Sequence, residues 1–125
     1  MTKGTVAVVG ASTDRSKFGN KAVRAYVHQG WAVYPVNPSA TEIEGLRAYP
    51  SVAEVPAQLD RVALYLPPQL GVKVLPSIAA VAPREFFVNP GAESEEFLAE
   101  ARRLGLEPIL ACSIVAIGES PDDLD

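Results

Sequence analysis

The sequence has little cysteine, little histidine and no long apolar run, and each scarcity excludes a class of protein. With Cys112 as its one cysteine, the chain cannot form an internal disulfide, and a zinc site would lack sulfur ligands. No apolar stretch reaches the length of a membrane span, and the first residues lack the features of a signal peptide. We therefore expect a cytoplasmic protein with no metal site and no membrane partner.

Positive charge is also scarce. The chain has 11 basic and 15 acidic residues, a net charge of -4, and its basic residues form no block. A nucleic-acid partner would need such a block, so we exclude this class of partner. The length of 125 residues and the hydrophobic content of 48% fit one globular domain, spanning residues 1–125.

Strand and helix patterns alternate along the chain. Apolar runs typical of buried strands predict strands at 6–9, 31–36, 61–66, 85–88 and 108–111. Apolar stripes at helical spacing predict helices at about 19–29, 70–82 and 94–104, and a capping box at Ser51 and Glu54 predicts a short helical turn. We expect a loop at 39–50, with a weak strand near Leu46, and a frayed tail after Gly118.

This alternation predicts the α/β class. We expect a single doubly wound, Rossmann-like, mainly parallel five-stranded sheet with helices on both faces. In such a sheet, ligands bind outside the carboxyl ends of the strands, at the switch point of the strand order. The loops after the first four predicted strands are rich in glycine, proline, serine and asparagine. Turn residues are needed in any loop, but here they gather with hydrogen-bonding side chains at one edge.

The first of these loops is built for an anion, but it departs from the dinucleotide fingerprint. Where G-x-G-x-x-G is expected, the chain has Gly10, Ser12 and Arg15, and no acidic residue follows the second strand at Asn37. Both departures disfavour NAD as the ligand of this loop. The loop nevertheless offers backbone N–H groups, a helix N-terminus and the charges of Arg15 and Lys17, although these two side chains could also be simply solvated.

Several short motifs follow one another from about residue 4 to residue 118. They are VAVVGAS at 6–12, YPVNP at 34–38, G-x-x-x-Y-P-S at 45–51, D-x-V at 60–62 and NPGAESEEF at 89–97, with Cys112 after the last strand. In this order and spacing the chain resembles the small stand-alone CoA-binding proteins. The fold of that family is similar to the CoA-binding domain of the succinyl-CoA synthetase alpha subunit.

The resemblance implies that the chain binds coenzyme A or an acyl-CoA. It implies that the first loop holds the phosphates, through Gly10, Ala11, Ser12, Thr13, Arg15 and Lys17. It places Asn37, Pro38 and Ser39 against the nucleotide part, Pro67 and Pro68 along a wall, and Asn89, Pro90 and Gly91 beside the pantetheine arm. Many relatives have glutamine at position 89, so the role of Asn89 stays open.

We expect binding without catalysis by the chain itself. Succinyl-CoA synthetases use a phosphorylated histidine in a further domain, whereas His28 is expected near the end of the first helix, on the surface or capping it. No carboxylate pair, metal cluster or triad emerges. Cys112 is expected to be a small buried hydrophobe, or else a thiol that forms a mixed disulfide with CoA.

One alternative comes from a different class of protein. The chain could be a small NADP-dependent reductase, in which Arg15 and Lys17 contact the 2′-phosphate of the cofactor. That alternative requires nicotinamide binding and a catalytic acid near the site. The sequence leaves the acyl group, the oligomeric state and any protein partner open.

Overall fold

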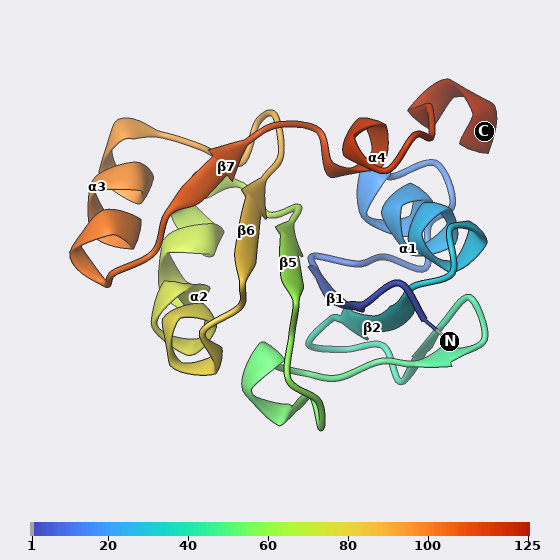
Figure 1. Cartoon of the computed structure of the whole chain (residues 1–125), viewed down its shortest axis with the longest axis horizontal. Helices are drawn as coiled ribbons and strands as arrows, with labels where there is room; N and C mark the ends of the chain where they lie inside the picture. The colour runs from blue at the N-terminus through green and yellow to red at the C-terminus, as the bar shows by residue number, and fades with distance from the viewer. Residues whose placement is uncertain (1) are drawn as a thin grey trace.

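A computed structural model describes residues 2–125 and has the predicted α/β architecture (Figure 1). A five-stranded, fully parallel sheet has the order β2-β1-β5-β6-β7. Its strands are β1 (Thr5–Val9), β2 (Ala32–Val36), β5 (Arg61–Leu64), β6 (Glu85–Val88) and β7 (Pro108–Leu110). The strand order reverses between β1 and β5, which is the switch point at which ligands bind in open sheets of this kind.

Helices cover both faces of this sheet, because its central strands bury apolar side chains on both sides. The helices α2 (Pro68–Val81) and α3 (Glu95–Arg103) pack over one face, around Leu64, Phe86 and Phe97. The helix α1 (Phe18–His28) and the short helix α4 (Ser113–Ala116) cover the other, around Val8, Val23 and Ile114. Figure 1 shows the two groups on opposite sides of the sheet. None of the helices among residues 2–125 combines the length and the apolar character that crossing a bilayer requires.

Local sequence signals set most of the element boundaries. Ser94 caps α3, since its side chain accepts a hydrogen bond from the Phe97 N–H at 3.1 Å. Ser51 caps the 3₁₀ turn η1 (Val52–Glu54), accepting from the Ala53 N–H at 3.2 Å. The expected weak strand near Leu46 is one arm of a small hairpin formed by β3 (Glu42–Ile43) and β4 (Leu46–Arg47).

Two expectations about boundaries were wrong. The strand expected at 61–66 ends at Leu64, and the helix expected from about residue 70 starts at Pro68, because the fixed φ of proline suits the first turn of a helix. The tail after Gly118 is also more ordered than its polar composition predicts. It forms the 3₁₀ turn η2 (Pro121–Leu124), which buries Leu124 against the α1 side of the sheet.

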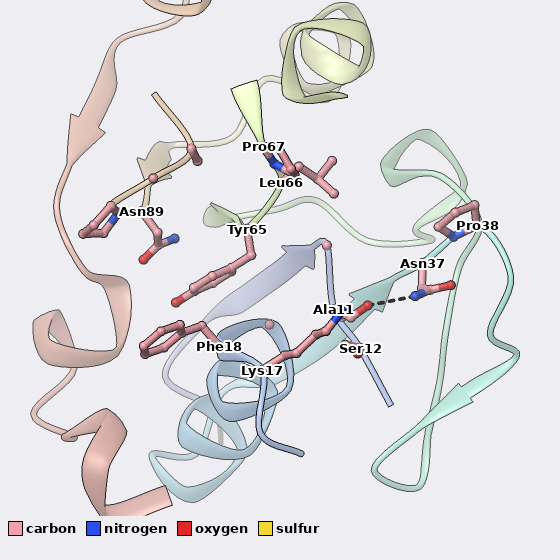
Figure 2. Close-up of a pocket in the computed structure, with 15 residues that line it drawn as sticks. Ala11, Ser12, Lys17, Phe18, Asn37, Pro38, Tyr65, Leu66, Pro67 and Asn89 are labelled. Atoms are coloured by element: carbon pink, nitrogen blue, oxygen red, sulfur yellow. Dashed lines mark hydrogen bonds between the residues drawn. The ribbon is translucent and has the colours of Figure 1, made fainter. Parts of the chain in front are cut away.

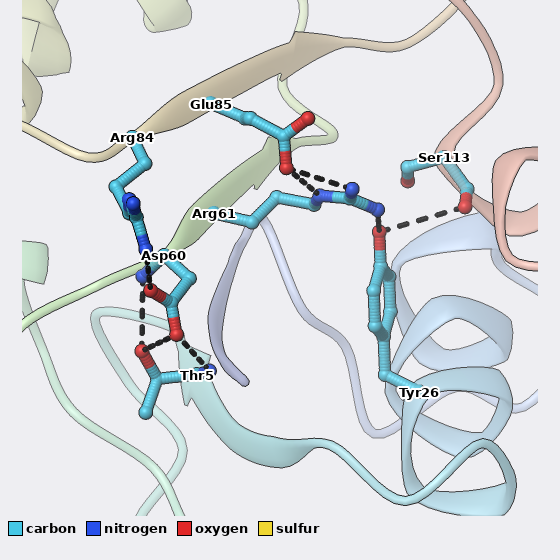
Figure 3. Close-up of polar contacts among 7 residues, drawn as sticks. All are labelled: Thr5, Tyr26, Asp60, Arg61, Arg84, Glu85 and Ser113. Atoms are coloured by element: carbon cyan, nitrogen blue, oxygen red, sulfur yellow. Dashed lines mark hydrogen bonds and ion pairs between the residues drawn. The ribbon is translucent and has the colours of Figure 1, made fainter. Parts of the chain in front are cut away.

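Polar contacts tie the amino ends of the strands together (Figure 3). Arg61 lies between the rings of Trp31 and Phe87, with its guanidinium carbon 4.8 and 4.4 Å from their centroids. It donates to Glu85 at 2.8 Å and to the Tyr26 hydroxyl at 3.3 Å. A largely buried cation thus covers apolar strand surface, and its polar groups keep partners.

Asp60 makes stability depend on pH at this edge. Its carboxylate accepts from the Thr5 N–H at 2.9 Å, and this bond, with that from the Thr5 hydroxyl, lowers the pKa of Asp60 below its usual 3.8. A lowered pKa contributes stability above pH 3.8 that is lost as the pH falls through the folded-state value. We predict a smaller loss of stability between pH 6 and pH 3 in Asp60→Asn than in the natural chain, measured by urea unfolding. Equal losses would contradict this assignment.

Candidate functional site

A cavity of about 550 Å³ opens at the carboxyl edge of the sheet, at the switch point (Figure 2). Its walls come from the loops that follow β1, β2, β5 and β6, as the doubly wound topology requires. The lining residues are Gly10, Ala11, Ser12, Lys17, Phe18, Gly19, Asn37, Pro38, Tyr65, Leu66, Pro67, Asn89, Pro90, Gly91 and Ala92.

Two glycines allow the first loop to cross this edge. A Cβ at Gly10 would lie 2.6 Å from the carbonyl oxygen of Tyr65, and the backbone there has φ +93°. A Cβ at Gly19 would lie 2.2 Å from the carbonyl oxygen of Gly10. Gly10 is therefore required by the segment that follows β5, and Gly19 lets the start of α1 pack directly on the loop.

Asn37 fixes the shape of the loop. Its Nδ2 donates to the Ala11 carbonyl at 2.9 Å, and its Oδ1 accepts from the N–H groups of Ser39 and Ala40 at 2.8 Å. The side-chain amide is thereby used within the protein, and its part in the site is to hold Ala11 in place (Figure 2). The missing acid after the second strand is thus replaced by an asparagine that organises two loops.

The loop presents the chemistry that an anion needs. The helix α1 begins at Phe18, and its N-cap residue, Lys17, makes no side-chain cap, so no side chain at the cap occupies the first N–H groups of the helix. Lys17, Phe18 and Gly19 all line the cavity. The positive end of the helix dipole and the Lys17 ammonium both attract an anion. Lys17 is the one charged side chain in the lining formed by residues 2–125.

Arg15, predicted to contact phosphate, lies elsewhere. Its guanidinium pairs with Glu44 in the β3–β4 turn, and Asn20 donates to the same carboxylate at 3.1 Å. These contacts, that of Asn20 first, lower the pKa of Glu44. Arg15 therefore links the loop to the hairpin and does not line the cavity. The predicted residues Thr13, Ser39 and Pro68 are also absent from the lining that residues 2–125 form: Thr13 is exposed, Ser39 follows the turn at Asn37, and Pro68 starts α2.

A buried polar cluster supports the opposite wall. Asn89 donates to the Leu64 carbonyl at 3.0 Å and accepts from the Ser113 N–H at 2.8 Å. The Ser113 hydroxyl also lies 2.8 Å from the hydroxyl of Tyr65, which lines the cavity. Burial raises the pKa of Tyr65 strongly, so its phenol stays protonated at neutral pH. Asn89 thus joins the sheet to α4, and the free thiol of Cys112, at the N-cap of α4, does not line the cavity.

The sequence analysis missed five lining residues. Phe18 and Gly19 begin α1, Tyr65 and Leu66 follow β5, and Ala92 directly follows the predicted site residues 89–91. Tyr65 and Leu66 were assigned to the third strand, which hid them. Gly19 could have been found, because a glycine at the start of a helix that follows a strand often permits close packing of the two.

Comparison with known proteins gives one family. A family described as "CoA binding domain" matches residues 4–118. The alpha subunit of the ADP-forming acetate–CoA ligase II of Pyrococcus furiosus is 40% identical over 63 residues, which are 50% of this chain and 14% of that protein. The alpha subunit of ligase I from the same organism is 31% identical over 97% of this chain and 29% of that protein. The chain spans less than a third of these curated relatives.

Solved structures share the fold. A conserved hypothetical protein from Pyrococcus furiosus superposes with a TM-score of 0.83 at 35% identity, covering 90% of this chain and 98% of that one. The dinucleotide-forming acetyl-coenzyme A synthetase 1 of Ca. Korarchaeum cryptofilum, solved with phosphate and ADP, gives a TM-score of 0.75 at 30% identity. That match covers 86% of this chain and 25% of the synthetase.

Proposed function

The chain belongs to the CoA binding domain family, and from this premise we propose that it holds coenzyme A or an acyl-CoA in the cavity at the carboxyl edge of the sheet. The observation that carries the proposal is the meeting of the four loops around one space. The glycine loop after β1, the Asn37-Pro38 turn and residues 89–91 are far apart in the sequence, and all line the same cavity.

The diphosphate of CoA is assigned to the first loop. A diphosphate carries negative charge and many acceptor oxygens, so it requires N–H donors and a cation. The start of α1 supplies the donors, and Lys17 supplies the cation. The close packing of Gly19 on Gly10 supports this assignment, because it brings the helix N-terminus to the loop.

The pantetheine arm is assigned to the wall between Tyr65 and Gly91. This wall combines the ring of Tyr65 and the proline rings of Pro67 and Pro90 with backbone amide groups. Pantetheine likewise alternates methylene and methyl groups with two amides, so the wall matches its chemistry. The three residues 89–91 face this arm, as the family resemblance implies.

We assign binding without turnover to the chain alone. A nucleophile or a general base would have to be a side chain able to give or take a proton near neutral pH. The cavity lining formed by residues 2–125 contains no histidine, cysteine or carboxylate; its Tyr65 phenol stays protonated, and we assign its Lys17 to phosphate binding. Any chemistry on the thioester would therefore come from another protein or domain, as the larger size of the relatives suggests.

Binding can be tested by thermal denaturation and calorimetry. We predict that CoA raises the melting temperature, because a ligand that binds only the folded state stabilises it.

We also predict that Lys17→Gln weakens CoA binding about tenfold, the loss expected for one charge-assisted hydrogen bond. The control is Arg84→Gln, which removes an equal charge just before β6, at the opposite edge of the sheet.

Other ligands make the test specific. No shift with CoA would refute the proposal. An equal or larger shift with NADPH would support the reductase alternative, and an equal shift with ATP would mean that the loop recognises phosphates alone. Equal losses of affinity in Lys17→Gln and Arg84→Gln would remove Lys17 from the site.

A further inference from the structure

A second cavity lies beside the first, on the face of the sheet that α2 covers. Its volume is about 280 Å³, and it shares Gly10, Pro38 and Leu66 with the first cavity. The remaining walls come from the ends of β1 and β2, the segment before η1 and one side of α2: Val9, Val36, Pro50, Ser51, Val52, Leu70, Lys73, Val74 and Ser77. The two cavities can therefore hold parts of one ligand.

The lining of the second cavity suits a flat apolar ring. Most of its lining residues are apolar, among them Val36, Leu66 and Val74. A purine presents two apolar faces and a polar edge, and this cavity offers apolar walls with hydroxyl groups from Ser51 and Ser77. The Ser51 oxygen accepts the Ala53 N–H, and its own proton stays available to a ligand.

Lys73 distinguishes this cavity from an ordinary apolar groove. It is the one charged residue in the lining formed by residues 2–125, and it lies exposed on α2. None of the ion pairs or side-chain hydrogen bonds found between residues 2 and 125 engages its ammonium group. An apolar slot with one available cation is complementary to an aromatic base that carries an anion beside it.

We infer that Lys73 is a specificity-determining residue, which recognises the 3′-phosphate of an adenosine held in the second cavity. The inference rests on the proposed function, since it divides one CoA molecule between the two cavities. Among adenosine ligands with a 5′-diphosphate, CoA carries this 3′-phosphate, whereas dephospho-CoA and NAD lack it. Lys73 would thus make the chain select CoA, in place of the ribose-binding carboxylate that is absent after the second strand.

The test compares CoA with dephospho-CoA by calorimetry on the natural chain, on Lys73→Gln and on Arg102→Gln. Arg102 lies exposed on α3, so its substitution removes an equal charge from the neighbouring helix. We expect the natural chain and Arg102→Gln to bind CoA about fivefold more tightly than dephospho-CoA, as for one partly solvated ion pair. In Lys73→Gln we expect this ratio to fall below about twofold, mainly through weaker binding of CoA.

The outcomes separate the two proposals. If the natural chain binds both ligands equally, or if Lys73→Gln keeps the natural ratio, the role of Lys73 is refuted while the CoA proposal stands. If neither ligand binds, both proposals fail. Raising the salt concentration should also narrow the ratio in the natural chain and leave it unchanged in Lys73→Gln, because salt screens exposed charge pairs. Since Lys73 is exposed, its substitution should leave the melting temperature of the free protein unchanged.

Discussion

The Gly19→Ala protein should be destabilised by about 3 kcal/mol and should lose CoA binding. The added methyl carbon would lie 2.2 Å from the Gly10 carbonyl oxygen, and both partners are backbone, so neither can turn away. Relief requires α1 to move off the loop, which also displaces the N–H groups assigned to the diphosphate. Thermal denaturation should show a melting temperature lower by about 10 °C, and calorimetry should show no CoA binding.

The matched control for this change is Gly30→Ala. Gly30 also adjoins α1, but a Cβ there meets nothing within 4 Å, and the cost arises only from its φ of +85°. That strain is worth about 1 kcal/mol, and it lies far from the cavity lining, so CoA affinity should be unchanged. If Gly19→Ala proves no more harmful than Gly30→Ala, the close packing of α1 on the loop is not essential.

We expect Asn89→Ala to destabilise the fold by about 3 kcal/mol, since the substitution leaves the buried Ser113 N–H and the Leu64 carbonyl without their side-chain partner. The damage should spread to α4, which begins at Ser113, and to the Tyr65 hydroxyl that Ser113 contacts. Urea unfolding measures the first effect. Faster hydrogen exchange of the α4 amides measures the second.

Two variants define what the Asn89 result means. Ser94→Ala removes one helix cap and should cost only about 1 kcal/mol. Asn89→Asp keeps an acceptor for Ser113 but places a buried carboxylate oxygen against the Leu64 carbonyl, so at neutral pH it should be at least as destabilising as Asn89→Ala. A loss below 1 kcal/mol in Asn89→Ala would show that water replaces the amide at this site.

The sequence predicted the sheet well because its signals are local. A run such as Val6–Val9, with apolar residues on both faces, is compatible with little except a buried parallel strand. The turn residues after each strand then placed the site at one edge. The pairing of Arg15 with Glu44 could not be predicted in the same way, because 29 residues separate them and both are loop residues with no periodic pattern.

The ordered tail was missed for a similar reason. Its composition is polar, and its partner is distant in the sequence. The Lys21 ammonium pairs with Asp125 and donates to the Pro121 carbonyl at 3.3 Å, and 100 residues separate Lys21 from Pro121. For Gly19 and Tyr65 the error lay in the element boundaries, and not in distant contacts. Their local assignments were nearly right, but an error of one or two residues in an element boundary decides which side chains reach a cavity.

The position of β1 inside the sheet, between β2 and β5, has a consequence for folding kinetics. Its first loop is synthesised early, yet β1 pairs on one side with β2 and on the other with β5, where Val6 lies beside Arg61. Distant pairings of this kind slow folding, because the intervening chain must be ordered before they form. A nascent chain that has not yet emerged beyond β5 therefore cannot form the complete cavity at the carboxyl edge of the sheet. CoA can then stabilise the chain only in the last stage of folding.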